Sequence, residues 1–411
     1  MSKEKQIVAV VGGAVAGSEA VHQLVQHGIR CVVIEQKELP YGKIEDGLPR
    51  WHVKQRQKEM ELIDSRIGHD LVDFVPNTRL GEDIAFSELY ELGFSAILLA
   101  NGAWKDRPFP IKEIERFLGN GFWYQNPFVH WFNHHHEPDY DGEDIPILDD
   151  ALVVGGGLAS IDVVKIIQLE LVSRSLKERG ISADIVEMER KGIPLTLEEK
   201  GLKWGDLGLK GCLLLYRRDV TNMPLATIPP NASPEREKAI RNTRRKILAN
   251  ARDKYLFRFQ DHRQPVNILV EDGKLVGLRM IETDVIDRKA VPRKGTEHDV
   301  RGSMIISSIG SIPEPLEGIP MKWSTYDIES EQTGRVTGLN RVFGLGNAIT
   351  GKGNIRVSRL NAREIAAGVI EHHLPEGGVD VKLIRDEVKK WQEKAGYDGD
   401  YAAWARTHRK E

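Results

Sequence analysis

The sequence predicts an α/β fold made of two similar units. Two glycine-rich turns, at residues 12–17 and 155–160, each follow a short apolar run and precede a helix-like stretch. A strand, a tight turn and a helix in this order are typical of parallel sheets covered by helices. At 411 residues the chain is also long enough for two or three domains. We therefore expect two parallel sheets, each with a glycine turn at the end of a strand.

The first turn has the sequence context of a dinucleotide site. Residues 7–11 are all apolar, as in a strand buried inside a parallel sheet. A second strand at 31–34 ends in Glu35, whose carboxylate suits the hydroxyls of a ribose. Backbone N–H groups at the start of the helix would hold the pyrophosphate. The small residues that permit this approach are Gly12, Gly13, Ala16 and Gly17.

The second turn has a different residue behind it. Residues 151–154 form the expected strand, and the turn residues are Gly155, Gly157, Leu158 and Ala159. The next matching strand, 212–216, ends in Arg217 and Arg218 where a carboxylate would repel a phosphate. Two guanidiniums there favour the 2′-phosphate of NADPH over NADH. The alternative is that the two arginines form a solvated surface pair.

Each turn departs from the pattern G-x-G-x-x-G at one position. Ala14 adds a methyl group where the backbone would approach the phosphate. Ser160 replaces the third glycine of the second turn, which implies slightly looser packing of helix against strand.

Two Rossmann-like units in one chain suggest that one holds a flavin dinucleotide and the other a nicotinamide dinucleotide. The apolar stretches 95–103 and 303–310 are expected to mark the two crossings between an FAD domain and an NADPH domain inserted in it. We therefore expect four segments: an FAD-binding part at 1–103, the NADPH domain at 104–311, the second FAD-binding part at 312–375 and a helical tail at 376–411. In the second part, 341–348 is expected to be a strand and a helix to start near residue 358.

Three further motifs resemble a known group of flavoproteins. Residues 40–52 and 128–133 are similar to segments of adrenodoxin-type ferredoxin–NADP reductases, and the Tyr-Arg-Arg at 216–218 with Met-Pro at 223–224 resembles the small subunit of glutamate synthase. The resemblance covers about residues 6–370 and belongs to the pyridine nucleotide-disulfide oxidoreductase superfamily. The redox dithiol of that superfamily is missing, because the two cysteines, Cys31 and Cys212, form no C-x-x-C pair.

The resemblance implies the residues of both cofactor sites. For FAD these are Gly12, Gly13, Ala16, Gly17, Glu35, Lys43, Gly102, Gly346, Asn347, Gly353 and Ile355. For NADPH they are Gly155, Gly157, Leu158, Ala159, Arg217 and Arg218. His52 is a candidate near the flavin by the same resemblance, and a hydrogen-bonded structural histidine is the alternative. No catalytic triad is expected, because the cofactors themselves hold the reacting atoms.

Three functions remain open from the sequence. The first is an FAD oxidoreductase that takes hydride from NADPH and passes electrons to a ferredoxin-like or flavodoxin-like carrier. The second is the flavin subunit of a larger complex of the glutamate synthase type. The third is a non-redox scaffold that binds FAD, which the second turn and the arginine pair disfavour.

Composition and local patterns exclude other classes. A net charge of −3 and the lack of a long apolar run argue against nucleic acid and membrane partners, and a cytoplasmic location is the expectation. Residues 134–136 are three consecutive histidines, expected in a loop and without a metal, since adjacent side chains do not face one ion. The basic stretch 235–254 either docks an acidic carrier or is a solvated helix face. The helix-like tail at 381–395 is expected to pack on the body or on a partner subunit.

Overall fold

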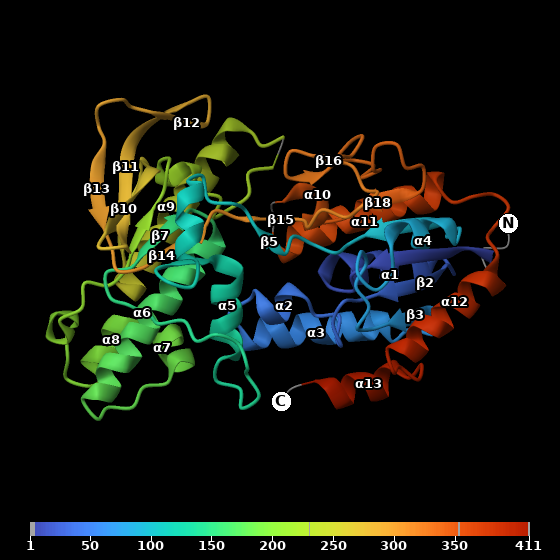
Figure 1. Ribbon diagram of the computed structural model, residues 1–411, viewed down its shortest axis with the longest axis horizontal. Helices are drawn as coiled ribbons and strands as arrows, with labels where there is room; N and C mark the ends of the chain where they lie inside the picture. Colours follow the sequence, from blue (N-terminus) through green and yellow to red (C-terminus); the bar gives the residue numbers. More distant parts are fainter. Residues whose placement is uncertain (1–4, 230, 352–353, 410–411) are drawn as a thin grey trace. The chain divides into compact units, whose positions relative to one another are not determined.

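The computed structural model describes residues 5–229, 231–351 and 354–409, and the chain divides into two compact units (Figure 1). Unit 1 comprises the described residues within 1–48, 52–105 and 311–411, and unit 2 comprises residues 49–51 and the described residues within 106–310. Each unit has its own buried apolar core. The contacts place the main crossings after Lys105 and after Gly310, and they group the C-terminal tail with unit 1.

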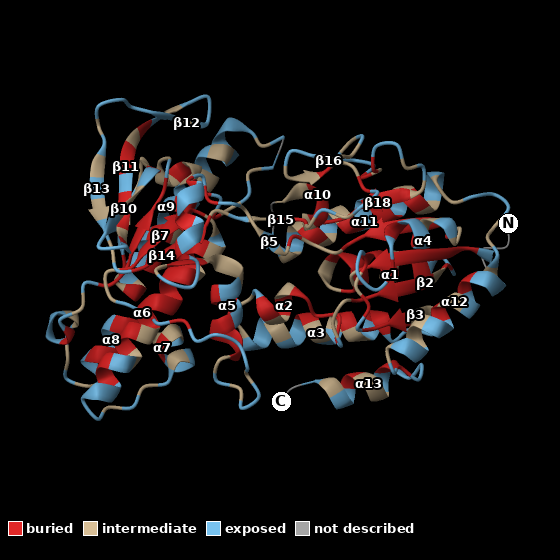
Figure 2. Cartoon of the chain, in the orientation of Figure 1, coloured by how far each residue is buried: buried red, intermediate tan, exposed pale blue. Residues whose placement is uncertain are grey.

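The described part of unit 1 is organised around a five-stranded parallel sheet with the order β18-β4-β1-β2-β3. Its strands are β1 (Ile7–Val11), β2 (Arg30–Ile34), β3 (Val72–Val75), β4 (Ala96–Leu99) and β18 (Val342–Gly344). Every residue of β1 is buried, because helices cover the faces of a parallel sheet (Figure 2). The carboxyl ends of β1 and β4 lie in register, since Val11 pairs with Leu99.

Helices from both ends of the chain complete unit 1. They are α1 (Val15–Gln26), α2 (Lys43–Asp46), α3 (Val53–Ile67), α4 (Phe86–Glu91), α10 (Asn347–Thr350), α11 (Ile355–His372), α12 (Val381–Lys394) and α13 (Tyr401–His408). The short strands are β15 (Ser311–Ile312), β16 (Met321–Lys322) and β17 (Thr325–Tyr326), and β5 (Lys105–Asp106) stands at the boundary of the two units in the sequence. Helix α11 packs along α1, which brings the second sequence segment of the unit to the first glycine turn.

The described part of unit 2 contains a second five-stranded parallel sheet, with the order β6-β14-β7-β8-β9. Its strands are β6 (Phe122–Tyr124), β7 (Leu152–Gly155), β8 (Leu213–Leu215), β9 (Arg258–Gln260) and β14 (Ile305–Ser308). The helices are α5 (Gln125–His134), α6 (Leu158–Glu178), α7 (Ile185–Lys191), α8 (Ile193–Glu198) and α9 (Pro234–Tyr255), with 3-10 turns η2 (Lys112–Phe117), η3 (Trp204–Leu207) and η4 (Val220–Asn222). The insertion between the second turn and β8 is therefore mostly helical.

Unit 2 also carries an antiparallel sheet that the sequence analysis did not anticipate. Strands β10 (Arg263–Glu271), β12 (Lys289–Pro292) and β13 (His298–Arg301) each pair with β11 (Lys274–Ile286). Much of β10, β12 and β13 is exposed. Their polar residues hide the alternation that identifies a half-buried strand.

Several predicted bounds were wrong in detail. The stretches 95–103 and 303–310 contribute only Ala96–Leu99 and Ile305–Ser308 to the sheets. The strand expected at 341–348 ends at Gly344, because Asn347 begins α10. Helix α11 starts at Ile355, where the Asn354 side chain caps it, three residues before the predicted start. In the part of the chain that the structure describes, no helix has the length and apolarity that a bilayer crossing requires.

Candidate functional site

The first turn accepts only glycine at two positions. Gly12 has φ of +91°, and a Cβ atom added there would lie 2.7 Å from the carbonyl oxygen of Ala100. A Cβ atom at Gly17 would lie 1.8 Å from the carbonyl oxygen of Gly12. The backbone of β1, the turn and α1 is therefore packed too closely for any side chain, which leaves the peptide groups themselves exposed to a ligand.

Helix α1 begins without a side-chain cap. Its N-cap residue is Ala14, with φ of −68°, and no described side chain accepts a hydrogen bond there. The N–H groups of the first turn and the positive end of the helix dipole are therefore suited to a phosphate. Since φ of −68° is ordinary for any L-residue, the methyl group of Ala14 causes no backbone strain.

Glu35 organises the turn from behind. Its side chain is 4% exposed, and Oε2 accepts a hydrogen bond from the Gly13 N–H at 2.9 Å. Oε1 accepts one from the Lys37 N–H at 3.2 Å. Burial raises the pKa of Glu35 to about 7, while these N–H groups oppose that rise. A buried carboxylate beside a glycine turn fits ribose hydroxyls, which can replace the backbone donors.

Lys43 and Gly102 lie around a tryptophan that sequence reasoning missed. The Nζ atom of Lys43 donates to Ser311 Oγ at 3.2 Å and lies 5.6 Å from the ring centroid of Trp104. Gly102 has φ of +72°, and a Cβ atom there would lie 3.7 Å from Trp104 Nε1. The position of Trp104 just after the small-residue turn that follows β4 was the signal available in the sequence.

Asn101 is a second residue that the sequence analysis overlooked. It follows β4, and its Nδ2 donates to the hydroxyl of Tyr326 at 2.8 Å. That hydroxyl donates in turn to the carbonyl of Glu314 at 3.0 Å. The Oδ1 atom of Asn101 is buried without a hydrogen-bond partner among the described residues. It is thus an acceptor available to a ligand at the carboxyl edge of the sheet.

Gly346 and Asn347 reach the first turn from the far end of the sequence. Gly346 has φ of +56°, and a Cβ atom there would lie 3.0 Å from Cβ of Ala16. Its N–H donates to Asn361 Oδ1 at 2.6 Å, and Ser358 Oγ donates to Asn347 Oδ1 at 3.4 Å. These two residues therefore lie against the start of α1. Ile355 is the first residue of α11, whereas Gly353 lies outside the described residues.

The second turn is also closed to side chains at its first position. A Cβ atom at Gly155 would lie 2.2 Å from the carbonyl oxygen of Ser308. Ser160 is fully buried, and its Oγ donates to that same carbonyl at 3.0 Å. Gly157 is the N-cap of α6, and its N–H donates to Ser160 Oγ at 3.2 Å. The hydroxyl of Ser160 thus fills the space that a third glycine would leave and ties α6 to β14.

The two arginines behind the second turn differ in their surroundings. The ring of Tyr216 covers the turn, since a Cβ atom at Gly156 would lie 2.3 Å from it. Arg218 Nε donates to the Tyr216 hydroxyl at 3.1 Å, and its Nη1 donates to the carbonyl of Arg288 at 2.9 Å. Arg217 is exposed and begins the loop directly after Tyr216. The guanidinium of Arg217 is therefore available to a ligand, while that of Arg218 holds the loop together.

Leu158 and Ala159 are the first residues of α6, and Leu158 is 44% exposed. The N–H groups of this first helical turn are in the same position relative to their sheet as those of α1 in unit 1. His52 is the N-cap residue of α3 in unit 1, and its side chain does not cap the helix.

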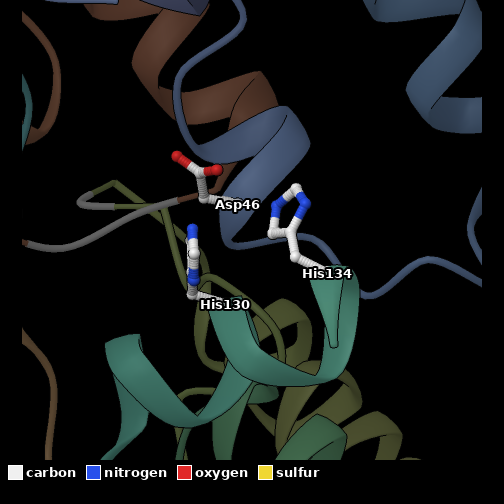
Figure 3. Close-up of side chains that lie close together, drawn as sticks. All are labelled: Asp46, His130 and His134. Atoms are coloured by element: carbon white, nitrogen blue, oxygen red, sulfur yellow. The ribbon is translucent and has the colours of Figure 1, made fainter. Parts of the chain in front are cut away.

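The neighbours of the three histidines at 134–136 predicted a loop, but the first of them belongs to a helix. His134 is the last residue of α5, and its Nδ1 lies 2.7 Å from Glu137 Oε1. His130 stands one turn earlier on α5, with the two ring centroids 4.5 Å apart (Figure 3). Asp46, also labelled in Figure 3, belongs to α2 of unit 1, where it forms an ion pair with Lys37.

Helix α9 uses part of its positive charge inside unit 2. Arg244 is buried, and its guanidinium donates to the carbonyls of Thr221 and Ala226 at 2.6–2.9 Å. Arg241 pairs with Glu237 at 2.6 Å. Arg245, Lys246 and Arg252 are exposed. Some basic residues of α9 therefore stabilise unit 2, and others lie on a face of the helix that is exposed to solvent.

Taken together, these features define a protein with two Rossmann-like dinucleotide-binding units. The solved structure of Mycobacterium tuberculosis FprA in complex with NADPH has the same fold, with a TM-score of 0.70 and 17% identity over 95% of this chain and 90% of that one. The predicted fold class is confirmed.

The curated proteins that match this chain in sequence include the following two. NADPH:adrenodoxin oxidoreductase from Arabidopsis thaliana is 25% identical over 342 residues, which cover 76% of this chain and 69% of that protein. The small chain of NADPH glutamate synthase from Mycobacterium tuberculosis is 31% identical over 166 residues, which cover 38% of this chain and 32% of that protein. No family model matches the chain. These relatives confirm the resemblance predicted from the motifs.

Proposed function

We propose that this chain is an FAD-dependent oxidoreductase that takes hydride from NADPH and passes electrons to a protein acceptor. The observation that carries the proposal is the pair of glycine turns, each in its own parallel sheet. The residues that stand behind the two turns have charges of opposite sign. Glu35 stands behind the first turn and Arg217 behind the second. A carboxylate selects a free ribose, whereas a guanidinium selects a ribose phosphate.

Unit 1 would hold FAD. Its pyrophosphate would bind to the uncapped start of α1, and Glu35 would accept hydrogen bonds from the adenosine ribose. When bound, the flavin supplies the hydride acceptor, and the protein supplies orientation and electrostatics. The residues that we assign to this site are Gly12, Gly13, Ala16, Gly17, Glu35, Lys43, Gly102, Gly346, Asn347 and Ile355, with Asn101 and Trp104 added from the structure.

Unit 2 would hold NADPH by the second turn. Leu158 and Ala159 would present backbone N–H groups to the pyrophosphate, and Gly155 and Gly157 would let the backbone approach it without a side chain. Arg217 would pair with the 2′-phosphate, because its side chain is exposed beside the turn. Arg218 would act indirectly, by fixing the Tyr216 ring that covers Gly156. The sequence pattern gave both arginines the same role in binding the phosphate. Their different hydrogen bonds instead support a direct role for Arg217 and an indirect one for Arg218.

The acceptor that we propose is a ferredoxin-like or flavodoxin-like carrier, with a partner enzyme subunit as the alternative. The Arabidopsis relative is named for adrenodoxin, and the bacterial relative is named as one chain of a synthase. Exposed Arg245, Lys246 and Arg252 on α9 are suited to an acidic carrier, since complementary charge speeds encounter.

The proposal is tested with the purified protein under anaerobic conditions. We expect a yellow protein whose visible flavin absorption is bleached by NADPH and more slowly by NADH. A protein that stays colourless after FAD is added would contradict the flavin assignment. Stable yellow colour that NADPH does not bleach would instead favour the non-redox scaffold.

A further inference from the structure

The C-terminal tail covers the β3 edge of the unit 1 sheet. Helix α12 packs against β3, and α13, dark red in Figure 1, continues the tail beyond it. The ring of Phe74 in β3 makes edge-to-face contacts with Tyr397 and Tyr401, at centroid distances of 5.7 Å and 5.2 Å. Gln392 Nε2 donates to the Phe74 carbonyl at 2.9 Å. The tail therefore contributes side chains to the core of unit 1. Of the two expected arrangements, packing on the body of the chain or on a partner subunit, the structure shows the first.

The last helix then reaches the segment that joins β2 to α2. Trp404 Nε1 donates to the carbonyl of Glu38 at 2.8 Å. Arg409 Nη2 donates to the hydroxyl of Tyr41 at 2.9 Å. The tail therefore holds this segment, residues 38–41, at both of its ends.

A shared carboxylate strengthens the second contact. Asp64 in α3 accepts hydrogen bonds from the Tyr41 hydroxyl at 3.1 Å and from the Tyr401 hydroxyl at 2.6 Å. It also forms an ion pair with Arg409. Hydrogen bonds in which one partner is charged are the stronger class in proteins. The network therefore links α3, the tail and residues 38–41.

Residues 38–41 in turn support the first glycine turn. A Cβ atom at Gly13 would lie 2.6 Å from Cβ of Pro40, so these two residues are in close contact. Gly13 is the residue whose N–H bonds to Glu35. Leu39, Pro40 and Tyr41 are all buried. A displacement of residues 38–41 would therefore move Pro40 away from Gly13 and disturb the hydrogen bond between the Gly13 N–H and the Glu35 carboxylate.

We propose that Tyr401, Trp404 and Arg409 are positioning residues that hold residues 38–41 against the first glycine turn, and so set the affinity and residence time of the adenosine half of FAD. The inference rests on the proposed function of unit 1. A loop without this support would have to lose its conformational freedom when the dinucleotide binds, which costs affinity. FMN, which lacks the adenosine half, would not depend on the tail.

The test compares FAD and FMN on the full chain. In Trp404→Ala and Arg409→Ala we expect faster FAD release from the holoprotein and a dissociation constant for FAD raised about tenfold, which corresponds to about 1.4 kcal/mol. The dissociation constant for FMN should change little, so the preference for FAD over FMN falls. The matched control is Arg406→Ala, because Arg406 is an exposed arginine on the same helix.

A second variant separates positioning from general stability. Trp404→Phe retains a ring to stack on His408, whose centroid is 3.9 Å from that of Trp404, but it loses the N–H donor to Glu38. It should fold like the wild type and show an intermediate loss of FAD preference. Equal weakening of FAD and FMN in these variants, or no weakening of either, would overturn the proposal. Failure of the wild-type chain to bind any flavin would instead overturn the proposed function.

Discussion

The two glycine turns share a backbone arrangement but differ in what stands behind them. In unit 1 the carboxylate of Glu35 is buried and accepts the N–H of Gly13, so the residue that selects the ligand also shapes the turn. In unit 2 Arg217 is exposed, and the shape of the turn depends on Tyr216 and Ser160 instead. The comparison teaches that the same strand–turn–helix backbone can prefer different ligands. The preference depends on the residue after the next parallel strand of the sheet.

The turns also differ in how closely the helix approaches. At Gly17 a Cβ atom would lie 1.8 Å from a backbone oxygen, so this position has no room for a side chain. The corresponding residue of the second turn, Ser160, has room and uses it to donate a hydrogen bond to the carbonyl of Ser308. The sequence predicted looser packing of helix against strand at the second turn, and the hydroxyl of Ser160 occupies the extra space.

The largest effect is expected from exchanging these two residues between the turns. Gly17→Ser should abolish flavin binding and destabilise unit 1, because its Cβ would overlap the carbonyl oxygen of Gly12. Ser160→Gly should lower the free energy of unfolding by only about 2 kcal/mol, because it removes the hydrogen bonds of Ser160 Oγ to the Ser308 carbonyl and from the Gly157 N–H, each worth about 1 kcal/mol. Flavin content after purification and urea unfolding measure the two outcomes. Similar behaviour of the two variants would show that the turns are equivalent.

Glu35 should give unit 1 a pH dependence. Burial raises its pKa to about 7 from an ordinary 4.5, so the folded protein keeps a proton that the unfolded chain releases in this window. Stability from Glu35 is therefore full below about pH 4.5 and is lost as pH rises to about 7, by on the order of 3 kcal/mol. The measurement is the free energy of unfolding of the flavin-free protein against pH.

Glu35→Gln should remove this slope, because an amide does not titrate in that range. Glu38→Gln is the matched control, since Glu38 is an exposed glutamate three residues after Glu35. A slope that survives in Glu35→Gln would assign the pH dependence to another group.

An effect much smaller than that of Gly17→Ser is expected from the arginines behind the second turn. Arg217→Ala should raise the KM for NADPH about 10- to 100-fold, because one charge-assisted contact to a phosphate is worth about 1.5–3 kcal/mol. The KM for NADH should hardly change. Arg218→Ala should lower thermal stability more and the preference for NADPH less, since its guanidinium bonds to Tyr216 and Arg288. A loss of NADPH preference confined to Arg218→Ala would reverse the roles that we propose.

The sequence by itself determined the two glycine turns, the strands that lead into them and the charged residues behind them. The all-apolar run at residues 7–11 and the glycines after it predict β1 and its turn, because local pattern and backbone sterics are encoded within a few residues. The same holds for Glu35, because one helix and one strand separate it from its turn. Arg217 follows the apolar run of β8, although α6, α7, α8 and η3 lie between the second turn and that strand.

Only the tertiary structure decided which side chains meet across long distances in sequence. Trp104 lies beside Lys43, Gly346 lies against Ala16, and Trp404 bonds to Glu38, and none of these pairs has a local pattern. The difference between Arg217 and Arg218 is of the same kind, because it depends on where Arg288 lies. Local sequence fixes the backbone conformations, but burial and partners follow from packing between segments, which no single stretch of sequence contains.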